Sequence, residues 1–196
     1  PGLRQELADR GFEVGVHGLT HEGRDFRDHE TFSRLVPRIN DYLREWKAAG
    51  YTSPAMLSNL SWVAELDAEY GCSSFDTDPF EPRPHGVRTI FPFVVPSLSR
   101  DRSYVELPYT LPQDHALFVL LQEPDDSIWR KKVDWIAQNG GLDMLNTHPD
   151  YMNFGDEPPA LELYPVDRYL SLLDYVKTRY AGRYWHALPR DAARFW

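Results

Sequence analysis

Cysteine is nearly absent from the sequence: Cys72 is the only one among 196 residues. A single cysteine excludes an internal disulfide and any zinc site built on several cysteines. A metal ion bound by this chain would therefore have to be held by histidine and carboxylate side chains.

Two further shortages exclude classes of partner. Lys and Arg number 21 against 30 Asp and Glu, which gives a net charge of −9 with neutral histidines. A surface of that sign repels polyanions, so we expect no nucleic-acid partner. The longest apolar runs, such as residues 90–96 and 116–121, fall far short of the roughly 20 residues that span a bilayer, so we expect no membrane partner.

Several catalytic motifs are also missing. No glycine-rich phosphate loop follows a predicted strand, which leaves a nucleotide site without support. The sequence has no G-x-S-x-G segment, and Cys72 has no activating partner near it in sequence. A serine or cysteine nucleophile is therefore unsupported.

Helical and strand patterns alternate along the chain. The predicted helices cover residues 3–10, 31–49, 59–70, 126–139, 165–180 and 189–196. The predicted strands cover residues 12–16, 51–54, 72–77, 142–147 and 184–187, with 78–96 as loop and edge strand. This alternation predicts one α/β domain over residues 1–196, with a mainly parallel sheet wrapped by helices. A closed or nearly closed β/α barrel fits best, and an open doubly wound sheet is the alternative.

The sharpest local signal is the segment V-H-G-L-T-H, in which His17 and His21 lie four residues apart. Two imidazoles at this spacing can face one ion in a helix or tight turn, and they suit zinc and neighbouring divalent metals. A pair at this spacing also arises by chance in a chain with seven histidines. Because the pair follows a predicted strand, where the loops of a β/α fold carry the site, we predict a divalent metal ion: zinc, with nickel or cobalt as alternatives.

A second signal is His148, at the carboxyl end of the predicted strand 142–147. A histidine there can donate a proton to a leaving group, because its ordinary pKa lies near neutrality; a capping or loop role is the alternative. Weaker carboxylate candidates are Asp76, Asp78 and Asp114. The remaining histidines are predicted to face solvent or to pack: His29, His85, His115 and His186. Asp125 and Asp126 are predicted to cap a helix.

Together, these segments resemble the polysaccharide deacetylase family, the NodB-type carbohydrate esterases. The resemblance is carried by residues 11–17 with Thr20 and His21, and by residues 145–148. Residues 89–93, 106–114 and 147–152 are similar to one branch of that family. The similarity extends over nearly the whole chain.

The resemblance implies a distorted β/α barrel of seven strands that lacks its first strand here. It implies a metal-dependent hydrolase that removes acetyl groups from an N-acetylated sugar or polysaccharide. In such enzymes one Asp and two His hold a divalent metal that polarises the acetyl carbonyl and a water, a second Asp is the base, and a late His protonates the leaving amine. The matching positions are His17 and His21 as metal ligands, His148 as the catalytic acid, and Asp114, Leu145 and Pro54 as substrate contacts.

The sequence departs from the family pattern in three ways. The paired aspartates of the first strand would precede Pro1, so we expect the chain to begin inside the domain and to be weakly active alone. Thr52 stands where an arginine would orient the base, and Leu145 comes one residue early, with Asn146 after it. A missing first strand would leave an edge beside residues 12–16 open to association.

Three functions are consistent with these residues. The first is the acetyl-removing hydrolase. The second is a carbohydrate-binding pseudoenzyme that has lost the base, and the third is a hydrolase of another non-peptide C–N bond, such as a cyclic amide. Aspartates upstream of Pro1 would favour the acetyl-removing hydrolase over the pseudoenzyme. A substrate screen would distinguish the acetyl-removing hydrolase from the hydrolase of another C–N bond.

Overall fold

The structure is a computed structural model that describes residues 2–21, 23–77, 86–98, 101–155, 158 and 160–196. The chain divides into two compact units. The first comprises Pro1–Ser74, Phe91–Pro108 and Ala187–Trp196, and the second Phe75–Ile90 and Tyr109–His186. The first unit carries His17 and His21, and the second carries His148. The division into two units does not test the prediction of a single domain over residues 1–196, which stays a prediction.

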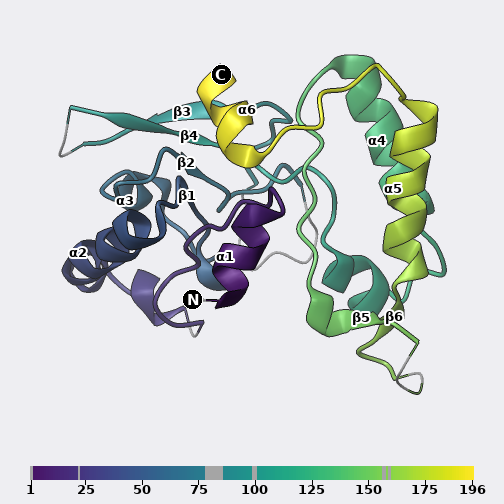
Figure 1. Ribbon diagram of the computed structural model, residues 1–196, viewed down its shortest axis with the longest axis horizontal. Helices are drawn as coiled ribbons and strands as arrows, with labels where there is room; N and C mark the ends of the chain where they lie inside the picture. Colours follow the sequence, from purple (N-terminus) through teal and green to yellow (C-terminus); the bar gives the residue numbers. More distant parts are fainter. Residues whose placement is uncertain (1, 22, 78–85, 99–100, 156–157, 159) are drawn as a thin grey trace. The chain divides into compact units, whose positions relative to one another are not determined.

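A small sheet forms the centre of the first unit (Figure 1). Its strands are β1 (Gly50–Tyr51), β2 (Tyr70–Gly71), β3 (Phe93–Pro96) and β4 (Ser103–Glu106). They lie in the order β1-β2-β4-β3, with β1, β2 and β4 parallel and β3 antiparallel to β4. Val16 adds an isolated parallel bridge to Tyr51. The carboxyl ends of the parallel strands therefore lie at one edge of this sheet.

The same unit carries several helices, the longest of which buries an apolar stripe. They are α1 (Gly2–Asp9), α2 (His29–Trp46), α3 (Leu60–Val63) and α6 (Pro189–Phe195), with 3-10 turns at Arg24–Phe26 and Pro54–Met56. The longest, α2, begins where the Asp28 side chain accepts the Thr31 N–H and ends at the left-handed Lys47. Phe32 and Ile39 on α2 are fully buried in the core, and each contributes about 1.5–3 kcal/mol of apolar burial.

The second unit is built mainly from two helices, α4 (Ser127–Asn139) and α5 (Asp167–Arg179), which lie side by side (Figure 1). Its other elements are the π-helix η3 (His115–Leu120), the 3-10 turn η4 (Pro149–Tyr151), and the parallel strands β5 (Met152–Asn153) and β6 (Tyr164–Pro165). Trp129 of α4 is fully buried, and its indole N–H donates to the Pro112 carbonyl at 2.6 Å. Among the described residues, no helix is both long enough and apolar enough to cross a membrane.

The mixed α/β class with a parallel sheet is confirmed, and so are the helices that became α1, α2, α4, α5 and α6. The edge strand expected within residues 78–96 is confirmed as β3, whereas residues 78–85 lie outside the described part. The helix predicted over residues 59–70 was wrong beyond its first turn.

The strand predictions for residues 12–16, 72–77, 142–147 and 184–187 were largely wrong. The first two contribute only isolated bridges, at Val16 and Phe75. Residues 142–144 hydrogen-bond to Thr110 and Ile90 without forming a ladder. Short apolar runs predict burial well, but a strand also needs a partner in register. The ladder of β4 was missed because its polar flanks gave no strand pattern.

Glu106, at the end of β4, is a fully buried carboxyl group. One of its oxygens, Oε1, accepts hydrogen bonds from the Ser73 N–H and the Ser74 hydroxyl, each at 2.7 Å. The other, Oε2, has no hydrogen-bond partner within the described residues. It fills the space beside Gly71, where an added Cβ would lie 2.5 Å from it. Burial raises the pKa of Glu106 above its ordinary value.

We predict that Glu106→Gln flattens the pH dependence of stability. A carboxyl whose pKa is raised in the folded state binds its proton more tightly there than in the unfolded chain. Its contribution to stability is therefore complete below the ordinary pKa and is lost as pH rises through the folded-state value. Glutamine cannot ionise and removes this loss. Urea unfolding should show that the free energy of unfolding falls less between pH 5 and pH 8 in this variant than in the wild type. In the exposed control, Glu6→Gln, it should fall as much as in the wild type. An equal fall in Glu106→Gln would contradict the prediction.

Candidate active site

The His17–His21 loop starts from a backbone anchor on β1. Val16 donates its N–H to the Gly50 carbonyl at 3.0 Å and accepts the Thr52 N–H at 2.9 Å. The ring Nδ1 of His17 lies 3.0 Å from the Thr52 carbonyl oxygen. Since a carbonyl can only accept, Nδ1 carries the proton and Nε2 carries the ring lone pair. The rings of His17 and His21 lie 5.3 Å apart between centroids and are tilted by 57°.

A buried carboxylate holds this loop in shape. Asp25 is 2 % exposed, and its Oδ2 accepts the Leu19 N–H at 3.0 Å while its Oδ1 accepts the Thr20 hydroxyl at 3.2 Å. At Gly18 the backbone is left-handed, with φ 69°. A Cβ there would lie 2.4 Å from the ring of Pro54, which is fully buried. The loop therefore needs a glycine at position 18, and the structure places Pro54 behind the loop as its support.

The two imidazoles fit a divalent metal as part of its ligand set. A histidine whose Nδ1–H is held by a backbone carbonyl presents Nε2 to a metal, which is the usual outer support of such ligands. The described residues contain no group of three or more His, Cys, Asp or Glu side chains that could hold an ion. His17 and His21 would therefore need water or a further carboxylate to complete the coordination.

His148, in the second unit, is held by a buried carboxylate. Its Nδ1 lies 2.7 Å from Asp114 Oδ1, and its backbone N–H donates to Asp114 Oδ2 at 2.7 Å. The Asp114 side chain is completely buried, whereas that of His148 is 37 % exposed. Because the Asp114 carboxylate can only accept, Nδ1 of His148 carries a proton. The other ring nitrogen, Nε2, is the one left for proton transfer.

Two further donors complete the environment of Asp114. The His115 N–H donates to Oδ1 at 2.8 Å, at the start of the π-helix η3, and the Tyr164 hydroxyl donates to Oδ2 at 2.9 Å. The Tyr151 ring lies 5.4 Å from His148 and 4.8 Å from His115. Four hydrogen bonds compensate the burial of this charge, and they place Asp114 beneath His148 rather than on an exposed surface.

The other predicted residues fall in separate places. Leu145 is half-buried against the apolar core of the second unit. Asp76 forms an ion pair with Lys132 at 2.6 Å, which accounts for its burial. Asp78 and His85 lie outside the described residues. The remaining contacts are His29 to Glu65 at 2.6 Å, Asp125 to the Ser127 N–H at 2.9 Å, Asp126 to Arg130 at 2.9 Å, and the His186 ring to Tyr184 at 6.3 Å.

Sequence reasoning missed two residues that support these histidines, Asp25 in the first unit and Tyr164 in the second. His115 packs against Tyr151, as one of its two predicted roles, and only its backbone N–H bonds to Asp114. Tyr164 and Asp25 carry no motif that would single them out. The available signal was indirect: a tyrosine and an aspartate within segments that had to be buried.

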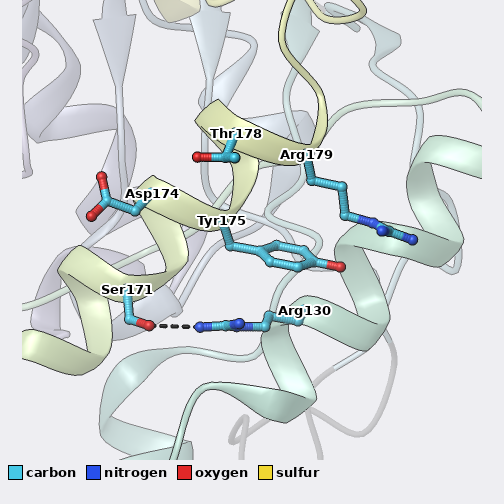
Figure 2. A pocket seen from close by; sticks show the side chains of 6 residues that line it. All are labelled: Arg130, Ser171, Asp174, Tyr175, Thr178 and Arg179. Atoms are coloured by element: carbon cyan, nitrogen blue, oxygen red, sulfur yellow. Dashed lines mark hydrogen bonds between the residues drawn. The ribbon is translucent and has the colours of Figure 1, made fainter.

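A shallow pocket between α4 and α5 lies in the second unit (Figure 2). It is lined by Arg130, Ser171, Asp174, Tyr175, Thr178 and Arg179. Arg130 donates to the Ser171 hydroxyl at 2.6 Å and stacks over the Tyr175 ring at 4.7 Å. Arg179 and Tyr175 both donate to Asp134. These contacts join the two helices, and none of the site residues predicted from the sequence lines the pocket.

This fold is similar to that of several solved structures, two of which illustrate it. One is assigned as a polysaccharide deacetylase from Mycobacterium smegmatis; it matches with a TM-score of 0.64 and 20 % identity, over 98 % of this chain and 65 % of that one. The other is Puue allantoinase, with a TM-score of 0.58 and 15 % identity, over 100 % of this chain and 62 % of that one. The chain has a polysaccharide-deacetylase-like fold.

This deacetylase-like fold confirms, at the level of the fold, the family resemblance drawn from the sequence. The chain spans less than two thirds of the length of either structure. No protein-family model matches the sequence, and no curated protein sequence matches it.

We predict that Gly18→Ala destabilises the protein more than Gly11→Ala does. Both glycines are left-handed, with φ 69° and 86°, and each alanine should cost about 1–2 kcal/mol of backbone strain. Only the Cβ at position 18 meets another group, the Pro54 ring, which should add roughly 1–3 kcal/mol. Urea denaturation of the two variants measures the difference. Equal losses would show that the loop can move away from Pro54.

Proposed function

We propose that the protein is a metal-dependent hydrolase that removes acetyl groups from an N-acetylated sugar or polysaccharide, built on a barrel of the NodB type. The observation that carries the proposal is the Asp114–His148 pair, with Nδ1 to Oδ1 at 2.7 Å, in a chain with a deacetylase-like fold. A histidine oriented by a buried carboxylate is suited to move protons near neutral pH.

His148 is the general acid in this proposal. Asp114 accepts the Nδ1–H and stabilises the imidazolium, so that the proton to be transferred is held at Nε2. Breaking a C–N bond leaves an amine that must gain a proton, and the Nε2–H supplies it. Since Asp114 also binds the His148 N–H, it fixes backbone and ring together and limits the ways in which the imidazole can turn.

His17 and His21 would hold the metal ion. A divalent metal in such a site polarises the acyl carbonyl and lowers the pKa of a bound water. The Thr52 carbonyl sets the tautomer of His17, and Asp25 shapes the loop through Leu19 and Thr20. The substrate class is a carbohydrate, and Leu145 is proposed to contribute apolar surface near the acyl group.

A second candidate is the hydrolysis of another non-peptide C–N bond. It is supported by the fold likeness to an allantoinase, at a TM-score of 0.58. The same residues would serve, because a cyclic amide also needs a polarised carbonyl and a protonated leaving nitrogen. The deacetylase proposal has the better structural match, 0.64 against 0.58.

We predict that His148→Asn lowers hydrolysis by about a hundredfold to ten-thousandfold. The assay follows acetate release from N-acetylglucosamine oligomers with zinc, nickel or cobalt, and uses cyclic amides in parallel. The assay uses the full-length protein. His186→Asn, an exposed matched control, should retain the rate. Hydrolysis indifferent to His148→Asn would remove His148 from the mechanism.

We predict that His17 and His21 share one weakly bound metal ion. Two protein ligands make an incomplete site, and the described residues offer no group of three or more ligands, so the affinity should be low. Metal analysis after mild dialysis against zinc should show less bound metal in His17→Ala and none at this site in the double variant with His21→Ala. His29→Ala, whose imidazole lies 2.6 Å from Glu65, should match the wild type. An unchanged number of bound metal ions per chain in the double variant would contradict the assignment of His17 and His21 as ligands.

A further inference from the structure

Tyr164 bonds to the oxygen of Asp114 that the His148 ring does not use. Its hydroxyl donates to Oδ2 at 2.9 Å, while Nδ1 of His148 lies 2.7 Å from Oδ1. Tyr164 is 1 % exposed, so water does not compete for its hydroxyl. The arrangement is a buried chain of three groups, tyrosine to carboxylate to imidazole.

The fold ties Tyr164 to the segment that carries His148. Strand β5 begins at Met152, four residues after His148, and pairs in parallel with β6 so that Met152 lies opposite Tyr164. The Val166 N–H donates to the Asn153 carbonyl at 3.1 Å and closes the pair. The Tyr164 ring packs 4.7 Å from Phe118 of η3, the π-helix that starts directly after Asp114. Met152 and Phe118, which contact Tyr164, therefore belong to elements that follow closely on His148 and Asp114 in the chain.

We propose that Tyr164 is a positioning residue that acts on His148 through Asp114. The proposal rests on the proposed role of His148 as the general acid. A hydrogen bond from a neutral hydroxyl stabilises the negative charge of Asp114 and so weakens the attraction of that charge for the imidazolium. The His148 imidazolium therefore releases its proton more easily than it would without the Tyr164 hydroxyl. The same hydrogen bond fixes the orientation of the Asp114 carboxylate, and so that of the ring bonded to it.

The surroundings fit a permanently neutral donor. Burial, and then the charge of Asp114, raise the pKa of Tyr164 above its ordinary value, while Arg168 opposes this and Tyr169 adds to it. Two further titratable groups lie beside the pair: the Tyr151 ring, 5.4 Å from that of His148, and the His115 ring, which lies 4.8 Å from that of Tyr151. Tyr164 therefore remains a donor throughout the range in which a histidine titrates.

The test is an NMR titration of His148 in the wild type and in Tyr164→Phe, which removes one oxygen and keeps the ring. The His148 signals are assigned by their loss in His148→Asn. Without the hydroxyl, Asp114 attracts the imidazolium more strongly, and we expect the pKa of His148 to rise by about half a unit to one unit. The alkaline limb of the pH–rate profile for kcat should move by the same amount, with little change in KM.

Two controls separate this effect from loss of packing. Tyr175→Phe removes another tyrosine–aspartate hydrogen bond of the same unit, Tyr175 to Asp134 at 2.7 Å, and should leave His148 unchanged. In an Asp114→Asn background the effect of Tyr164→Phe on His148 should vanish, because Tyr164 acts through the carboxylate.

If Tyr164→Phe unfolds, 3-fluorotyrosine at position 164, a stronger donor, is expected to lower the pKa of His148. An unchanged pKa with either replacement, or a shift of the opposite sign, overturns the proposal. A shifted pKa together with hydrolysis indifferent to His148→Asn supports the positioning of His148 and overturns the proposed function instead.

Discussion

The second unit depends on the burial of one charge. Asp114 has no exposed surface and receives four hydrogen bonds, from the His115 and His148 N–H groups, the His148 ring and the Tyr164 hydroxyl. A buried carboxylate without partners would cost several kcal/mol. The start of η3, the turn at His148 and strand β6 must therefore all be in place together, so the residue that orients the histidine also binds three parts of the chain to one another.

The first unit uses the same device at its histidine pair. Asp25 is buried below the His17–His21 loop and is bonded to Leu19 and Thr20, while the ring of His17 is set by a backbone carbonyl. In each unit a histidine ring is fixed by a hydrogen bond from Nδ1 to an oxygen, that of the Thr52 backbone carbonyl for His17 and that of a buried carboxylate for His148. A ring supported in this way keeps its tautomer and its direction. These are the properties that metal binding and proton transfer require.

Sequence patterns predicted some levels of this structure and not others. Apolar periodicity located α2, α4 and α5 because a helix buries a stripe that its own sequence records. The strand over residues 142–147 was wrong because strand formation depends on a partner elsewhere in the chain. His17, His21 and His148 could be singled out by residue type and by family resemblance. Tyr164 could not, since a buried tyrosine in an ordinary apolar segment gives no sign that its hydroxyl will meet a carboxylate more than forty residues away.

The contact between position 18 and the ring of Pro54 also couples the effects of substitutions at the two positions. Any side chain at position 18 enters the space of that ring, whereas a smaller residue at position 54 would leave a gap behind a glycine. A larger residue at position 18 therefore requires a smaller one at position 54. Even then the left-handed backbone at position 18 favours Gly, or Asn and Asp, over other residues. At the one position where the loop turns between its two histidines, the available space and the backbone conformation therefore favour the same residue, glycine.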